Sequence, residues 1–265
     1  DGIWEENTKG GLTVFGKEVI KKIILEHAIS SLKFIDKDKI IYSTYHNPQK
    51  ENYDEKLFEI IETIPFQSNG AGFTQGKFSQ LFLMDLNTQI TVELSSSSEN
   101  VMTFELNDDK SILFYTSIEN SGKLTFYPNL YQMDLGTLEK NTCYENGTLS
   151  IGNIIPLKDK IYVTASSLKE HGINQNNDFY QVSNNELILV TQFGLSANNS
   201  IGSDVRYGGS KKSHIYNDKY YFVGTYHKYN RIYSFDGEEI SVFYESKGSI
   251  DGWHFINNHT IRLIS

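Results

Sequence analysis

Apolar residues along this chain come in short runs that end at Asp, Asn, Ser or Gly. One run begins at Leu81 and stops in a polar turn at 85–88, and nearly the same eight residues return from Leu130, 49 positions later. Related runs begin at Phe179 and Ile232, and a weaker one begins at Ile3. An apolar run that stops at turn-forming residues is typical of a β-strand that leads into a turn.

A second pattern keeps step with the first. It consists of a strand, an Asp/Asn-rich turn and another strand, because Asp and Asn tolerate the backbone angles of tight hairpins. It recurs at 34–44, 104–116, 155–164, 215–223 and 255–263. One repeating unit is therefore a hairpin, a connection, a third strand, a turn and a fourth strand. A period of roughly 40–50 residues in a strand-rich chain predicts the four-stranded antiparallel blades of a β-propeller, an all-β fold.

The repeats place full blades at 29–98, 99–149, 150–199 and 200–248. Residues 1–28 predict half a blade, with a third strand at 3–5 and a fourth at 20–26, and residues 249–265 supply only a first hairpin. Pairing of the two ends would complete about five blades, one of them composite, in a single domain over 1–265. The alternative is an excerpt from a longer propeller.

The first full blade carries a long insertion at 47–78. Residues 56–62 within it fit either a short helix or a strand, and glycines at 70, 72 and 76 make the backbone permissive. A loop of this length inside a compact blade is either functional or partly disordered, and the sequence leaves both interpretations open.

Composition narrows the class of partner. The 265 residues are 38% hydrophobic and include 17 Tyr and 16 Phe, enough apolar surface for a large all-β core. The net charge of −9 argues against nucleic acid, and no apolar run is long enough to span a membrane. Cys143 is the only cysteine, so no internal disulfide forms, which is compatible with a cytoplasmic location.

Motifs for chemistry are absent. The chain has no Gly-x-Ser-x-Gly, no phosphate-binding loop and no His-Glu-x-x-His, and glycines at 70–76 lack the context of a dinucleotide site. His46 and His227 end equivalent strands, but two histidines make a weak metal site. Asp36, Asp38 and the pair at 108–109 resemble parts of a calcium loop that turn chemistry explains better. We therefore expect no catalytic residue, no metal and no cofactor, and an inert Cys143.

One stretch resembles a known family. Residues 64–77 contain Pro-aromatic, Asn-Gly-x-Gly-Phe and Gly-Lys elements, and they run into the strand from Gln80 to Asp85. This stretch resembles the propeller of prolyl-oligopeptidase-family serine peptidases, in the acylaminoacyl-peptidase branch. The Tyr-Ser-Phe-Asp-Gly at 233–237 also suits that family. Gln67 and Ser68 stand where aromatic residues are expected, and seven blades are usual in the family.

The resemblance implies a non-catalytic domain whose partner is a hydrolase domain of the same polypeptide. That family's propeller caps the active site and limits entry to short peptides. Phe66, Phe73, Lys77 and Arg206 are then the candidates for contact with peptide or with the hydrolase domain. A stand-alone propeller that scaffolds a protein partner is the main alternative. A third possibility is a metal-dependent propeller enzyme such as a lactonase, for which the sequence shows no ligand cluster.

Overall fold

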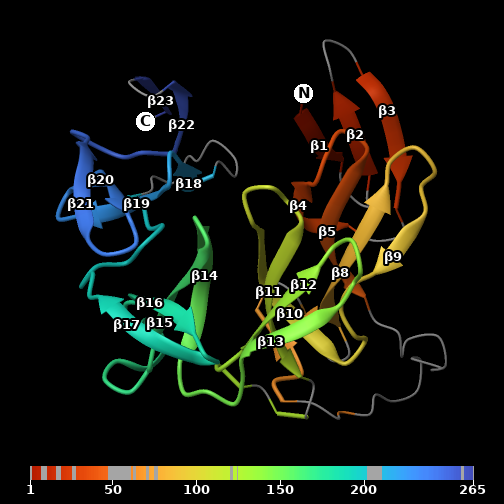
Figure 1. The fold of residues 1–265 in the computed structure, drawn as a ribbon, viewed down its shortest axis with the longest axis horizontal. Coiled ribbons are helices and arrows are strands. Elements are labelled where there is room, and N and C mark those ends of the chain that lie inside the picture. Colours follow the sequence, from red (N-terminus) through yellow and green to blue (C-terminus); the bar gives the residue numbers. More distant parts are fainter. Residues whose placement is uncertain are drawn as a thin grey trace. The chain divides into compact units, whose positions relative to one another are not determined.

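The fold was analysed in a computed structural model of the 265-residue chain. The structure describes residues 2–6, 11–15, 19–25, 28–46, 61, 64–69, 72–74, 77–119, 122–123, 125–201, 211–257 and 260–264. Within these ranges the chain is almost entirely β-strand, and one 3-10 turn, η2 (Gly172–Asn174), interrupts it (Figure 1).

Sixteen strands form four antiparallel sheets of four, each in sequence order (Figure 1). The strands of the first sheet are β4 (Ile29–Phe34), β5 (Lys39–His46), β8 (Phe78–Asp85) and β9 (Thr91–Glu93). Those of the second are β10 (Glu99–Leu106), β11 (Ile112–Glu119), β12 (Asn129–Asp134) and β13 (Lys140–Tyr144). Both repeated sequence patterns lie where they were expected, on the first hairpin and on the third strand.

The same arrangement continues in the second half of the chain. The third sheet consists of β14 (Ser150–Leu157), β15 (Lys160–Ser166), β16 (Asp178–Ser183) and β17 (Glu186–Thr191). The fourth consists of β18 (Ser213–Tyr216), β19 (Lys219–Tyr226), β20 (Tyr229–Phe235) and β21 (Ile240–Glu245). Four-stranded antiparallel blades of this kind confirm the predicted all-β propeller class.

The N-terminal segment differs from its prediction. It forms three strands rather than two: β1 (Gly2–Glu6), β2 (Gly11–Phe15) and β3 (Val19–Ile24), paired in that order. Residues 3–5 therefore lie in β1, at the edge of this three-stranded sheet. The strand that pairs with β3 is β2, and it was not expected. The expectation was wrong because Gly11 resembles a turn residue, although Leu12 and Val14 alternate with Thr13 as a strand requires.

The C-terminal segment forms the expected hairpin of β22 (Gly252–Asn257) and β23 (Thr260–Ile264). A two-stranded hairpin is only marginally stable by itself, so it needs a packing partner. Trp253 and Ile250 are buried against Tyr221, Val223 and Ile232 of the fourth sheet. A composite blade made from both ends of the chain stays a prediction.

The chain divides into two compact units. One contains residues 1–102, 115–126 and 136–138, and the other contains residues 103–114, 127–135 and 139–265. The division runs through the second sheet. The single domain expected over 1–265 also stays a prediction.

Aromatic and β-branched side chains fill the cores of both units. In the second unit Phe179, Phe222 and Phe235 are fully buried, and the rings of Phe179 and Phe235 lie 4.8 Å apart. In the first unit Ile40, Tyr42 and Met84 are buried together. Burial of each such side chain contributes about 1.5–3 kcal/mol, so these clusters account for the preference of Tyr- and Phe-rich runs for this fold.

Candidate functional site

The two ends of each four-stranded sheet differ in their connections. Antiparallel strands alternate in direction, so the first and third turns of a sheet leave from one end, and all other connections leave from the opposite end. The first and third turns hold two to five residues in every sheet. The opposite end carries the long segments, which span 47–77, 120–128, 167–177 and 192–212. Long connections on a rigid scaffold are where binding residues concentrate, so in each unit the candidate residues are sought at this end of its sheets.

The insertion of the first blade contains a small hairpin. Strands β6 (Gln67–Ser68) and β7 (Gly72–Phe73) pair with Gln67 opposite Phe73. The N–H of Thr74 donates to the carbonyl of Phe66 at 2.8 Å and extends the ladder. Gly72 adopts φ +67°, where a side chain would be strained. Most of the segment at 56–62 lies outside the described residues, so its helix or strand stays a prediction.

The hairpin is fastened to the neighbouring connection within the first unit. The N–H of Ile64 donates to the carbonyl of Gly122 at 3.2 Å, and Ile64 forms a parallel bridge with Lys123. Ile64 itself is 71% exposed. The insertion is therefore held by backbone contacts while it presents an apolar side chain to solvent.

The structure places the sequence-predicted contact residues as follows. Phe66 is half-buried beside the hairpin, and Lys77 is exposed where the chain enters β8, with its N–H on the carbonyl of Thr74 at 3.1 Å. The backbone of Phe73 pairs with that of Gln67, but the side chain of Phe73 is not among the groups that the structure describes. Arg206 lies wholly outside the described residues. The hairpin thus brings the backbones of Phe66 and Phe73 together, and the role of all four residues stays a prediction.

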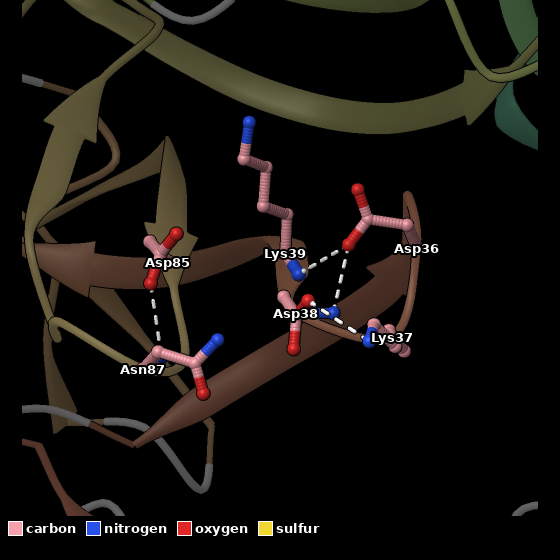
Figure 2. Close-up of polar contacts among 6 residues, drawn as sticks. All are labelled: Asp36, Lys37, Asp38, Lys39, Asp85 and Asn87. Atoms are coloured by element: carbon pink, nitrogen blue, oxygen red, sulfur yellow. Dashed lines mark hydrogen bonds and ion pairs between the residues drawn. The ribbon is translucent and has the colours of Figure 1, made fainter.

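The acidic turns at the opposite end of the first sheet are explained by their own backbone. Figure 2 shows the Asp36 carboxylate turned toward the N–H groups of Asp38 and Lys39, which donate to it at 2.7 and 2.9 Å. Asp85 accepts in the same way from Asn87 and Thr88, and these bonds, chiefly that from Thr88, lower the pKa of its carboxyl. Among the described residues no group of three His, Cys, Asp or Glu could hold a metal ion.

The other candidates for chemistry occupy ordinary structural positions. His46 is the last residue of β5, and His227 follows β19 with φ +52°, its ring edge-on to Tyr226. Cys143 lies half-buried in β13, and burial raises the pKa of its thiol to about 11. No helix in the described part of the chain is long and apolar enough to cross a membrane.

One feature of the site was missed from the sequence. Eleven residues, 167–177, join β15 to β16, whereas the equivalent strands β19 and β20 are joined by His227 and Lys228 alone. The sequence could have revealed this loop. When the third and fourth blades are aligned on their second and third strands, the third blade has nine additional residues between those strands. The segment is named the 167–177 loop below.

No protein-family model and no curated protein sequence matches the chain. Solved structures do match. The chain superposes on the acylaminoacyl peptidase of Pyrococcus horikoshii with a TM-score of 0.66 and 15% identity, over 96% of this chain and 38% of that one. A puromycin-hydrolyzing peptidase of Mycobacterium tuberculosis matches with a TM-score of 0.60 and 8% identity, over 95% and 37%. TolB from Acinetobacter baumannii matches with a TM-score of 0.51 and 14% identity, over 89% and 49%.

At these identities the matches show a shared fold. The chain has the propeller fold of the two peptidases, as the sequence resemblance implied. It spans less than two-fifths of the length of each of them.

Proposed function

We propose that this chain is the non-catalytic propeller domain of a serine peptidase of the acylaminoacyl-peptidase type. The observation that carries the proposal is the match to the Pyrococcus horikoshii peptidase over 96% of this chain. The resemblance of residues 64–77 to the family's insertion is independent support, because it comes from sequence rather than from fold. The catalytic hydrolase domain would be part of the same polypeptide, in the cytoplasm.

The proposed role of the domain is to limit access to the active site to short peptides. Such a filter needs a rigid scaffold and an obstructing surface, and it needs no acid, base or nucleophile. The four-stranded sheets with their buried aromatic clusters supply such a scaffold. The 47–77 insertion of the first unit, which includes the β6–β7 hairpin, would supply the obstructing surface.

The first test is to determine the coding sequence that follows the codon for Ser265. A Gly-x-Ser-x-Gly in the next few hundred codons, followed by Asp and His, is the expected result. A stop codon close to Ser265 would overturn the proposal. It would leave a stand-alone propeller that binds a protein partner as the second candidate.

The second test addresses access in the full-length polypeptide. Replacement of residues 47–77 by a short Asn-Gly turn should let long peptides be cleaved while kcat/KM for short peptides stays nearly unchanged. Lys77→Ala should alter KM for peptides, and Lys37→Ala is the matched control, because Lys37 is a fully accessible lysine at the other end of the same sheet. If the variant still discriminates between short and long peptides as strongly as the wild type does, gating by the insertion is refuted.

A further inference from the structure

The segment between the second and third sheets contains an Asn-Gly pair. Residues 145–149 join β13 to β14, and Asn146 and Gly147 lie in the middle of this segment. The whole segment belongs to the second unit. Asparagine is one of the chemically labile residues of proteins. Its carboxamide can close a cyclic imide with the next backbone nitrogen, and a glycine at the next position has no side chain to obstruct that closure.

Neither of the two reacting groups is held by a hydrogen bond. Asn146 is exposed and Gly147 is half-buried. The backbone N–H of Asn146 donates to Oδ1 of Asn129 at 3.1 Å. In the part of the chain that the structure describes, no hydrogen bond involves the carboxamide of Asn146 or the N–H of Gly147. The carboxamide is therefore free to rotate, and the nitrogen of Gly147 is free to lose its proton to solvent.

The backbone at the pair can make the rotation that ring closure requires. Strand β13 ends at Tyr144 and β14 begins at Ser150, so both residues lie outside the strand ladders. Asn146 has φ +50°, a conformation that is less favourable for a residue with a side chain, so little is lost when it changes. The bonds made by the N–H groups of Asn146 and Leu149 lie on either side of the rotating bond.

Packing explains why a glycine follows Asn146. A Cβ atom at position 147 would overlap the phenol ring of Tyr144, which is buried at the end of β13. A larger residue at this position would have to displace a core side chain. The residue that makes the pair reactive is thus required by the fold.

Asn185 is the matched comparison within the same unit. It is exposed and has φ +60°, in the turn between β16 and β17. The next residue, Glu186, carries a side chain and pairs with Ser183 in the strand ladder. The nitrogen that would attack the carboxamide of Asn185 is therefore shielded and held. The other Asn-Gly pair of the chain, at 69–70, includes a glycine outside the described residues.

We propose that Asn146 is a site of spontaneous deamidation. The nitrogen of Gly147 gives its proton to solvent and forms a bond to Cγ of Asn146. The bond from Cγ to the side-chain nitrogen then breaks, and that nitrogen takes up a proton and leaves as ammonia. Water opens the cyclic imide at either carbonyl, so asparagine and water become aspartate or isoaspartate and ammonia, with nothing oxidised or reduced.

The modification would alter the connection between the two sheets. Both products add a carboxylate, and isoaspartate also adds a methylene group to the main chain. The bond from the N–H of Asn146 to Asn129 and the packing of Gly147 against Tyr144 both depend on the present backbone. We therefore expect the aged chain to be less stable than the fresh chain. This inference does not depend on the proposed function of the domain.

The test follows the purified chain during storage at mildly alkaline pH. Samples are digested in mild acid and analysed by mass spectrometry, and isoaspartate is labelled with protein isoaspartyl methyltransferase as the probe. Product should form at position 146 at least about tenfold faster than at position 185, where a side chain follows the asparagine. The rate at position 146 should rise with pH, because the attacking nitrogen must lose its proton. Peptide mapping separates this product from any at position 69.

Two variants and the unfolded chain complete the test. Asn146→Gln should remove the product at this position, since the longer side chain closes its ring slowly, and Asn185→Gln should leave the product at position 146 unchanged. If positions 146 and 185 react equally slowly in the folded chain while position 146 reacts rapidly in urea, the fold protects Asn146 and the inference is overturned. It is also overturned if the rate at position 146 does not depend on pH. The comparison of positions 146 and 185 in the wild type holds even if a variant fails to fold.

Discussion

The side-chain oxygen of Asn230 accepts a hydrogen bond from the backbone N–H of Ile250 at 2.9 Å, across 20 positions of sequence. The same oxygen accepts from the N–H of Ile201 at 3.2 Å, and Nδ2 donates to Oγ1 of Thr225 at 3.1 Å. Asn230 is fully buried. One carboxamide therefore ties the start of the third strand to the connection that leads toward the next hairpin.

Polar side chains near the start of the third strand make comparable bonds in the other three sheets. Asn129 accepts from the N–H of Asn146 at 3.1 Å, and Asp178 accepts from the N–H of Phe193 at 3.0 Å. Gln80 instead donates to the carbonyl of Ser96 at 3.2 Å. In each case a polar side chain near the start of the third strand satisfies a backbone group after the fourth. Buried backbone groups such as the N–H of Ile250 need such a partner, whereas the bond between Asn129 and Asn146 is exposed.

Asn230→Ala should lower the free energy of unfolding by about 2–4 kcal/mol. The substitution removes three hydrogen bonds of one side chain and leaves the buried N–H of Ile250 without its acceptor. Urea denaturation of the purified chain measures the change. Asn129→Ala is the graded control, with an expected loss of about 0.5–1.5 kcal/mol because its bond to Asn146 is exposed. If both variants lose the same free energy of unfolding, burial of a hydrogen bond does not determine how much its removal destabilises the chain.

Much of this fold could be predicted from sequence because the blades repeat. The runs from Leu81, Leu130, Phe179 and Ile232 all lie on third strands. Each strand alternates or clusters apolar residues and ends at a turn residue, so local pattern and long-range pairing agree. Strand β2 was not predicted because its apolar run begins at a glycine, which resembles a turn residue.

Details that depend on strand register could not be predicted. The pairing of third and fourth strands shifts at equivalent places, between Leu130 and Tyr131, Phe179 and Tyr180, and Ile232 and Tyr233. A β-bulge increases the local twist of a strand and discourages edge-to-edge pairing. A tyrosine follows the shift in all three sheets, but the alternation of apolar residues does not by itself reveal the extra residue in the fourth strand. The bracing of the 167–177 loop by Gln175 is likewise a contact between residues that local pattern does not connect.

Gly147→Ala should destabilise the second sheet by about 1–3 kcal/mol. A methyl group at this position would overlap the phenol ring of Tyr144, which is buried at the end of β13. The hydroxyl oxygen of Tyr144 accepts a hydrogen bond from the N–H of Leu149 at 3.3 Å. Gly248 occupies the same place after β21 and has open space around it, so Gly248→Ala should change stability by less than about 0.5 kcal/mol. Thermal denaturation of both variants tests the contrast, and similar melting temperatures would contradict it.

Cys143 should react slowly with a thiol reagent in the folded chain. Burial raises the pKa of its thiol to about 11, so very little reactive thiolate is present near neutral pH. The reaction should be slower than in the urea-unfolded chain by on the order of 100-fold, and it should accelerate as the pH is raised to 9. Because Cys143 is the only cysteine, the absorbance change reports this site alone. Equal rates in the folded and unfolded chain would show that the thiol is not protected.

The attachment of the C-terminal hairpin should weaken in acid. Burial holds the pKa of His214 below its ordinary value, and the nearby charges of Lys211 and His254 act in the same direction, although the 2.7 Å contact of Nε2 with the carbonyl of Trp253 opposes them. The unfolded chain therefore takes up a proton before the folded chain does. Stability contributed by neutral His214 is complete above the unfolded pKa of about 6.5 and is lost as the pH falls from there through the lower pKa of the folded chain.

His214→Gln should remove this part of the pH dependence. Glutamine can still donate to the carbonyl of Trp253, but it has no proton to gain between pH 8 and pH 5. The urea midpoint of the wild type should fall more steeply over that range than the midpoint of the variant, and the two should converge in acid. In a Trp4→Phe background Trp253, buried in the same cluster, is the only tryptophan, so its fluorescence follows the hairpin. Parallel midpoints from pH 8 to pH 5 would show that protonation of His214 is not linked to docking of the hairpin.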